Sequence, residues 1–238
     1  MNENNKAALV TGGAIRVGRA ISLALAKDGY DVALHYNSSH NDACAVKSEI
    51  ENLGCKCVLF QRNLAADFSG LVADVHAEFS ELNLLVNNAS IFEPHKFLET
   101  SESAFDDHMN INFKAPFFLT QEFAKICKNG NVINILDTFI TKHSHSYFTY
   151  LASKKVFAEF TKMAAKELAP DIRVNAIAPG TILPATGFDE EYIKAKEQNL
   201  PMGKIASVED VTNTMIDILH NKSLTGQIIF VDGGESLQ

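Results

Sequence analysis

Tyr150 and Lys154, four residues apart, are the strongest candidates for chemistry in this sequence. On a helix, residues at this spacing lie on one face in neighbouring turns. A free phenol has a pKa of about 10 and is a poor acid or base at neutral pH unless a nearby positive charge favours the phenolate. We expect Lys154 to supply that charge, so that Tyr150 can transfer a proton at neutral pH.

The segment 11–18, with the sequence T-G-G-A-I-R-V-G, indicates a second kind of chemistry, the binding of a phosphate group. It follows an apolar run at 7–10 and precedes apolar residues at helical spacing, so it joins a buried strand to an amphipathic helix. Such a turn presents backbone N–H groups and a helix dipole to a pyrophosphate, and its glycines let the ligand approach. We therefore expect a dinucleotide, although taken by itself the turn is also compatible with an ordinary strand-to-helix connection.

The end of the next strand, expected over 32–36, indicates which dinucleotide binds. Folds that bind NAD carry an acidic residue here, about 20 residues after the glycines, and this chain lacks it. Polar and cationic side chains suited to a 2′-phosphate are present instead, and the sequence predicts NADPH. The residues of this tip are Arg16, His35, Tyr36, Asn37, Ser38 and Ser39. The alternative is that Arg16 is a solvated surface charge and that the serines cap the helix expected over 41–53.

The order of apolar runs and amphipathic segments predicts an α/β fold, a Rossmann-type doubly wound parallel sheet. We expect strands over 7–10, 32–36, 58–61, 82–90 and 132–136, and helices over 41–53, over 67–79 and as two segments within 105–128. With 238 residues and 46% hydrophobic content, the chain is long enough for one large domain and too short for two. The prediction is a single domain, 1–238.

Charge and composition exclude several classes of partner. The formal net charge of −8 argues against nucleic-acid and anionic-membrane surfaces. The polar start 1–6 and the lack of a long apolar run predict a cytoplasmic protein with no membrane contact. Four cysteines without C-x-x-C spacing are expected to be reduced, and His143 with His145 lacks a third ligand, so we expect no metal site.

Motifs spread along the chain together resemble the short-chain dehydrogenase/reductase family. They are the family's glycine turn, its N-N-A strand end, N-x-x-x-P, Y-x-x-x-K, I-R-V-N-x-x-x-P-G and a terminal V-D-G-G. The matching segments are 11–18, 87–89, 112–116, 150–154, 172–180 and 231–234. Two positions depart from the pattern, because Arg16 replaces the middle glycine of the turn and Ser90 replaces the glycine after N-N-A.

The resemblance implies a role for each matching residue. Asn112 would perturb its helix and hold a water of the proton relay, and Lys154 would also bind the nicotinamide ribose. The segment 181–200 would form a substrate loop with a short helix, and the assembly would be a homotetramer. The implied cofactor-binding residues are Gly12, Arg16, Val17, Gly18, His35, Tyr36, Asn37, Ser38, Ser39, Asn63, Leu64, Asn88, Ala89, Ser90, Tyr150, Lys154, Pro179 and Gly180.

Asp137 points to one subgroup of this family, because most members have a serine at this position, thirteen residues before the tyrosine. A carboxylate opposes a developing alkoxide, so reduction of an ordinary ketone is disfavoured. An Asp–Tyr pair suits a basic ring nitrogen, and the chain resembles pteridine reductases and dihydromonapterin or dihydrofolate reductases. The predicted reaction is the NADPH-dependent reduction of a dihydropterin or dihydrofolate to its tetrahydro form. The substrate-binding residues implied are Arg16, Ser90, Phe92, Asp137 and Tyr150.

Alternatives remain open at this level. Ser90 could cap its strand, and Phe92 could be a packing residue rather than a ring that stacks on the pterin. The enzyme could be a ketoreductase for a carbonyl such as a 3-oxoacyl thioester, in which Thr138 or a water replaces the missing serine. An enoyl reductase does not fit the glycine turn, and a catalytically idle cofactor sensor would be expected to lose Tyr150 or Lys154.

Overall fold

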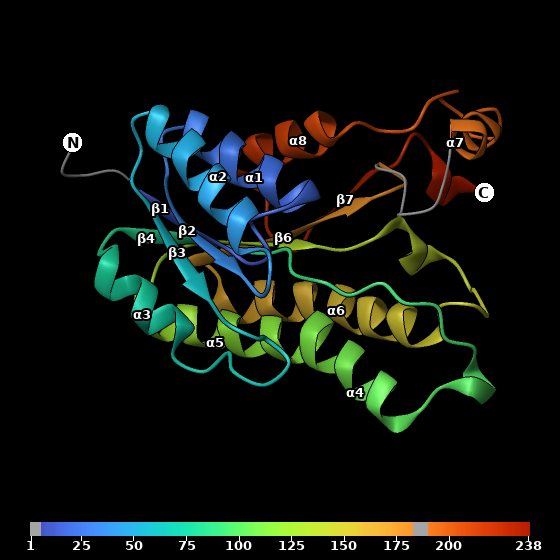
Figure 1. The fold of residues 1–238 in the computed structure, drawn as a ribbon, viewed down its shortest axis with the longest axis horizontal. Helices are drawn as coiled ribbons and strands as arrows, with labels where there is room; N and C mark the ends of the chain where they lie inside the picture. The colour runs from blue at the N-terminus through green and yellow to red at the C-terminus, as the bar shows by residue number, and fades with distance from the viewer. Residues whose placement is uncertain (1–5, 183–189) are drawn as a thin grey trace.

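Seven parallel strands form one sheet in the order β3-β2-β1-β4-β5-β6-β7 (Figure 1). The structure is a computed structural model, which describes residues 6–182 and 190–238. The strands are β1 Ala7–Val10, β2 Asp31–Tyr36, β3 Cys57–Gln61, β4 Leu82–Asn87, β5 Gly130–Ile135, β6 Ile172–Pro179 and β7 Ile228–Val231. This is the predicted Rossmann-type α/β architecture.

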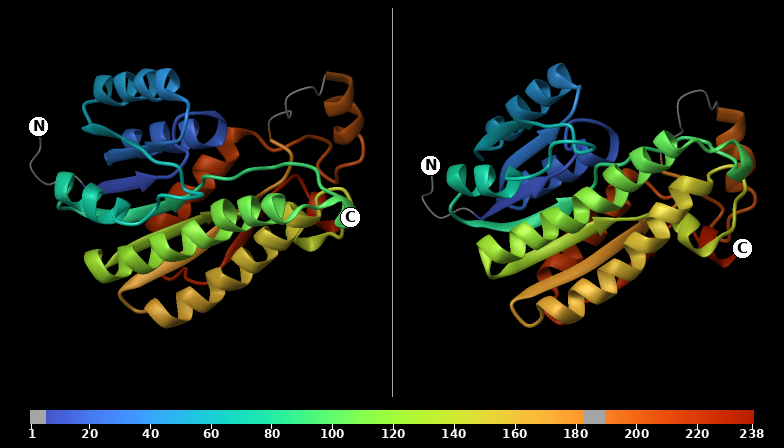
Figure 2. Two further views of the ribbon diagram at one scale, coloured as in Figure 1. Left: turned by 60° about the horizontal axis from the view of Figure 1, so that its bottom comes forward. Right: turned by 90° about the horizontal axis from the view of Figure 1, so that it is seen from below.

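Helices cover both faces of the sheet, with α1, α2 and α8 on one face and α3, α5 and α6 on the other (Figures 1 and 2). The helices are α1 Arg16–Lys27, α2 His40–Asn52, α3 Leu71–Glu78, α4 Glu102–Met109, α5 Ala115–Cys127, α6 Phe148–Leu168, α7 Glu190–Glu197 and α8 Val208–His220. Short 3-10 turns lie at η1 Phe97–Glu99, η3 Thr138–Thr141 and η4 Glu235–Leu237, and η2 Asn110–Lys114 is a π-helix.

The first strand shows why the strands read as continuous apolar runs. Ala8 and Val10 pack into the core under α1 and α2, whereas Ala7 and Leu9 pack into the core on the opposite face. All four are buried, because successive side chains of a strand point to opposite faces and both faces are covered.

The arrangement of strands creates the place for a ligand. From β1 the chain builds the sheet outward through β2 and β3, and then returns to β4 on the other side of β1. Ligands of open α/β sheets bind where the strand order reverses, outside the carboxyl ends of the strands. The glycine turn follows β1, the N-N-A segment begins at the last residue of β4 and Asp137 lies just after β5, so the predicted site residues meet at this edge.

Some predicted boundaries are wrong. The strand predicted over 82–90 ends at Asn87, because the N–H groups of Asn88 and Ala89 donate to the Thr11 hydroxyl instead of to a neighbouring strand. The helix predicted over 67–79 begins only at Leu71, since the residues before it form turns, with Asp67 N–H donating to the Asn63 carbonyl.

The two helical segments predicted within 105–128 are present as α4 and α5, and the first begins earlier, at Glu102. Ser101 caps it, because its hydroxyl accepts from the N–H of Ala104. The π-helix that joins α4 to α5 contains Asn112, so the local backbone is perturbed at the expected asparagine.

Three observations concern partners and oxidation. Over the ranges 6–182 and 190–238, no helix has the length and apolar character needed to cross a membrane. Within the same ranges, no three His, Cys, Asp or Glu side chains gather as metal ligands would. The four cysteines are free thiols, and burial raises the pKa of Cys57 to about 12.

Candidate active site

A cavity of about 570 Å³ runs along the carboxyl edge of the sheet, from the glycine turn to Asp137 and Tyr150. All residues predicted to contact the cofactor or the substrate line it, whereas Asn112 lies behind its wall. Their roles remain predictions. The lining also includes Ile182 and Lys196, which belong to the predicted substrate segment 181–200, of which 183–189 lie outside the described residues. The short helix predicted in this segment is α7. Phe139 lines the cavity too, and sequence reasoning did not single it out. No spacing motif marks Phe139, because it lies in the short turn η3, which only the fold brings to the cavity.

The glycine turn packs tightly against the end of β4. The Asn88 side-chain amide donates to the carbonyls of Thr11 (2.9 Å) and Gly12 (3.1 Å). A Cβ at Gly18 would lie 2.0 Å from the Gly12 carbonyl oxygen, so no larger residue fits there without moving the turn. These contacts hold the start of α1 at the cavity, where its N–H groups and dipole favour an anion.

Arg16 stands in a backbone position that favours glycine. Its φ is 51°, in the left-handed region where a Cβ costs about 1–2 kcal/mol. The family's glycine at this position is explained by that geometry. In this chain an arginine adopts the strained conformation, and its side chain is exposed at the cavity.

His35 lines the cavity, but both of its ring nitrogens bind protein backbone. Nδ1 accepts from the Gly12 N–H (3.0 Å), and Nε2 lies 3.1 Å from the Arg62 carbonyl oxygen, to which it donates in the neutral ring. Burial lowers its pKa to about 4. His35 therefore supports the glycine turn as a neutral ring, which differs from the charge-assisted contact to a phosphate that the sequence suggested.

The tip of β2 carries hydroxyl groups at the cavity. The Tyr36 hydroxyl lies 2.7 Å from His40 Nδ1, and Asn37 accepts at its carbonyl from the Gln61 side chain. Ser39 is the N-cap residue of α2, yet its side chain makes no capping hydrogen bond. The interpretation that this serine serves to cap the helix is therefore not supported.

Asp137, Tyr150 and Lys154 form the centre of the site. The Tyr150 hydroxyl donates to Asp137 Oδ2 at 2.7 Å, and Asp137 Oδ1 accepts from the Phe139 N–H at 2.7 Å. Lys154 is buried on the next turn of α6, where its ammonium donates to the Ile135 carbonyl at 2.9 Å. The ammonium lies 5.8 Å from the centre of the Tyr150 ring.

The protonation equilibria differ from the sequence prediction. Burial, and then the charge of Asp137, raise the pKa of Tyr150 well above its ordinary value, so the expectation that Lys154 would favour the phenolate is wrong here. Burial also raises the pKa of Asp137, against the Phe139 N–H, Tyr150 and Lys154, which lower it. Burial lowers the pKa of Lys154 to about 8. The site therefore holds Tyr150 as a protonated acid beside a carboxyl group that takes up a proton more readily than usual.

Asn112 acts through its neighbours. Its side-chain oxygen accepts from the Ile91 N–H (2.9 Å) and the Ser90 hydroxyl (3.1 Å), and its amide donates to the Ile91 carbonyl and to Ser153. This buried amide therefore fixes the loop after β4 against α6. The Ser90 hydroxyl donates its hydrogen bond to Asn112, and Ser90 also lines the cavity.

Three aromatic rings stand together beside Asp137. Phe92 is stacked on Tyr147 with centroids 4.4 Å apart, and it meets Tyr150 edge to face at 4.7 Å. Phe92 keeps 44% of its surface exposed, so it is a ring at the edge of the cavity and not a core residue.

The fold and this site define an oxidoreductase of the short-chain dehydrogenase type. The family profile described as short chain dehydrogenase matches residues 6–197, and the chain belongs to that family.

Relatives of this chain carry two different activities in their names. A FolM alternative dihydrofolate reductase 1 from Brucella canis, complexed with NADP, superposes with a TM-score of 0.93 at 35% identity over 98% of this chain and 95% of that chain. The FolM protein from Brucella suis, also in complex with NADP, gives 0.94 at 35% identity over 98% and 96%. A 3-oxoacyl-(acyl-carrier-protein) reductase, FabG of Staphylococcus epidermidis, is 32% identical over 97% of this chain and 98% of its own length.

Proposed function

We propose that this enzyme uses NADPH to reduce a dihydropterin or dihydrofolate ring to its tetrahydro form. The observation that carries the proposal is the 2.7 Å hydrogen bond from Tyr150 to Asp137 at the cavity, in place of a hydroxyl donor. The similarity of this chain to two FolM dihydrofolate reductases, whose structures are complexes with NADP, supports the same proposal.

The residues around the glycine turn fit a dinucleotide. Because Gly18 has no side chain, the Gly12 carbonyl can pack against the start of α1, and Asn88 and His35 hold the turn through hydrogen bonds. The turn lines the cavity, where a pyrophosphate would meet the N–H groups of α1. Arg16 and the serines after β2 would bind the 2′-phosphate, since no carboxylate at that tip repels it. When bound, NADPH supplies the hydride. Lys154 and the Pro179–Gly180 segment would hold the nicotinamide end.

Asp137 and Tyr150 would supply the proton. With Asp137 protonated, the pair can release one proton from Tyr150 to a ring nitrogen and still share another. With Asp137 ionised, the same transfer would place a phenolate beside a carboxylate, which is unfavourable in a buried site. The raised pKa of Asp137 therefore favours reduction.

Phe92 would provide the stacking surface for a flat ring. Tyr147 covers one of its faces, so a pterin would stack on the other, between Phe92 and the nicotinamide. Arg16 and Ser90 would bind polar atoms of the pterin.

The second candidate is a ketoreductase acting on a 3-oxoacyl thioester, which the similarity to FabG favours. It requires a hydroxyl donor near Tyr150, and the candidate is Thr138, which follows Asp137 in the sequence. The Thr138 hydroxyl donates instead to Asp232 Oδ2 at 2.9 Å, so its proton is already used. This contact favours the pterin over the carbonyl.

The experiment is an NADPH-oxidation assay that offers dihydrobiopterin, dihydromonapterin, dihydrofolate and an acetoacetyl thioester to the same preparation. We expect turnover of at least one pterin or folate. Turnover of the thioester with no reaction on any pterin or folate would overturn the proposal and select the ketoreductase.

Assembly and location belong to the same proposal. We expect a homotetramer, as is implied by the family, and a cytoplasmic enzyme. Light scattering that gives the mass of one chain would refute the tetramer.

A further inference from the structure

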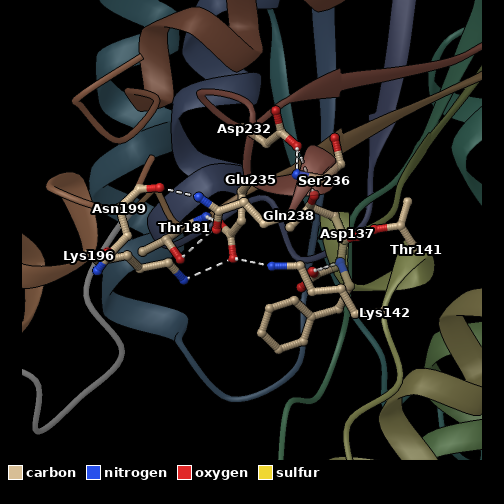
Figure 3. A network of polar contacts seen from close by, with 12 residues as sticks. Asp137, Thr141, Lys142, Thr181, Lys196, Asn199, Asp232, Glu235, Ser236 and Gln238 are labelled. Atoms are coloured by element: carbon tan, nitrogen blue, oxygen red, sulfur yellow. Dashed lines mark hydrogen bonds and ion pairs between the residues drawn. The ribbon is translucent and has the colours of Figure 1, made fainter. Parts of the chain in front are cut away.

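We propose that Glu235 is a positioning residue that holds the substrate side of the cavity together from behind. Three wall segments that are distant in sequence converge on its carboxylate (Figure 3). The kinetic part of this inference rests on the proposed function, and its structural part does not.

The contacts of Glu235 are direct. It is 2% exposed and begins the short turn η4. Its Oε1 atom lies 3.3 Å from the Lys142 ammonium and 3.0 Å from that of Lys196, and its Oε2 atom accepts from the Thr181 N–H at 3.2 Å. The Thr181 hydroxyl also donates to Oε2, at 3.5 Å. One carboxylate therefore binds two cations, one backbone donor and one hydroxyl donor.

Each partner lies in a different segment of the chain beside the cavity. Lys142 follows η3, the turn that Asp137 begins, and Lys196 lies in α7. Thr181 follows the end of β6. Thr181 and Lys196 line the cavity, whereas Glu235 does not. Glu235 can therefore set the shape of the site without touching the ligand.

The segment before Glu235 is itself fixed. Asp232 accepts from the N–H groups of Gly234 (2.9 Å) and Ser236 (2.8 Å), and from Thr138. A Cβ at Gly180 would lie 2.8 Å from the Asp232 Cα and 3.0 Å from Glu235 Oε2. The P-G and V-D-G-G motifs thus meet here, and the second motif delivers Glu235 to the back of the cavity wall.

The charge of Glu235 also affects Asp137, the carboxyl group that is hydrogen-bonded to Tyr150. Burial raises the pKa of Glu235, but Lys196, the Thr181 N–H and Lys142 bring it below its ordinary value, so the group is ionised. Its negative charge is one of the causes that raise the pKa of Asp137. The groups that face Asp137 are Tyr150, Lys154, the Phe139 N–H and Glu235.

The first test is structural and needs no substrate. Glu235→Gln keeps the size of the side chain and removes its charge. Glu197→Gln on α7 is the matched control, because the Glu197 carboxylate accepts, within 6–182 and 190–238, only from the Ile205 N–H. We expect amide hydrogen exchange in 190–197 and 138–142 to speed up about tenfold in Glu235→Gln, because local opening governs exchange. Lys196→Met, a partly exposed position, should affect 190–197 and spare 138–142.

The second test is kinetic. With the pterin or folate that the wild type reduces, Glu235→Gln should raise KM about tenfold, because a less rigid site binds the substrate more weakly. The change in kcat should be smaller than the change in KM. The limb of the pH profile in which kcat/KM falls, as pH rises through the raised pKa of Asp137, should shift to lower pH, since both the loss of the Glu235 charge and the two unbalanced lysines lower that pKa. A change in packing alone would not move this limb.

The outcomes separate the two proposals. If the wild type reduces no pterin or folate, the proposed function fails, and the exchange data and the kinetics on an accepted carbonyl still decide the role of Glu235. Unchanged exchange in both segments, in a Glu235→Gln protein that melts like the wild type, overturns the positioning role. An unchanged KM together with an unmoved limb of the pH profile also overturns it.

Discussion

Replacing Asp137 by Asn tests the proton-donating pair most directly. Asn has the shape of Asp, and its oxygen can still accept from the Phe139 N–H, but it can neither carry a charge nor share a proton with Tyr150. The variant therefore removes the chemistry proposed for Asp137 while it leaves the turn η3 in place.

The size of the effect follows from the 2.7 Å hydrogen bond between Tyr150 and Asp137. Hydrogen bonds to charged groups contribute about 1.5–3 kcal/mol, and a change of about 1.4 kcal/mol in the barrier is a factor of ten in rate. If this interaction acts in the transition state, kcat/KM for the dihydropterin should fall roughly 10- to 150-fold. The decline of kcat/KM as pH rises through the raised pKa of Asp137 should also disappear, because the variant has no carboxyl group to lose its proton.

The assay is NADPH oxidation over a range of pH, with Asp171→Asn as the control, an exposed aspartate just before β6. Asp137→Ser extends the test, because it restores a hydroxyl donor and should shift preference toward the acetoacetyl thioester. An Asp137→Asn enzyme that keeps the kcat/KM and the pH profile of the wild type would refute the role of this carboxyl group.

The remaining predictions concern the cofactor half of the site. The pKa of His35 falls from 6.5 to about 4, so the folded protein resists its protonation, and up to about 3 kcal/mol of stability should be lost as pH drops through this window. The His35→Asn variant should lose less free energy of unfolding between pH 7 and pH 4 than the wild type, as urea unfolding at the two pH values would measure. Equal losses in the two proteins would contradict this prediction. Gly18→Ala forces a Cβ to 2.0 Å from the Gly12 oxygen and should weaken NADPH binding by about tenfold or more in a fluorescence titration. Arg16→Ala should reduce the preference for NADPH over NADH by roughly 10- to 100-fold, through the loss of charge-assisted bonds; an unchanged preference would assign the 2′-phosphate to other residues.

Local sequence patterns predict the fold well because each pattern depends on near neighbours. The apolar run 7–10 must be buried on both faces, and a turn rich in glycine must follow it. Boundaries were less predictable where a distant partner decides them. The strand at 82–90 stops at Asn87 because the Thr11 hydroxyl, 77 residues away from Asn88, binds the next N–H groups.

The chemistry of single side chains shows the same division. The sequence identified Tyr150, Lys154 and Asp137 from their types and spacing, and the structure places the tyrosine and the aspartate within hydrogen-bond distance. It did not reveal that the pKa of Tyr150 would rise, since that depends on burial and on a carboxyl group thirteen residues away. The neutral state of His35 has the same origin.

By itself, the sequence determined the doubly wound sheet, the glycine turn and the residue types at the cavity, because helical and strand periodicity and the steric needs of glycine are local properties. Only the tertiary structure decided the protonation of Asp137 and Tyr150 and the convergence of Lys142, Thr181 and Lys196 on Glu235. Desolvation and ion pairing depend on which groups the fold brings within a few ångströms. Thr138 and Asp232, 94 positions apart in the chain, are hydrogen-bonded here.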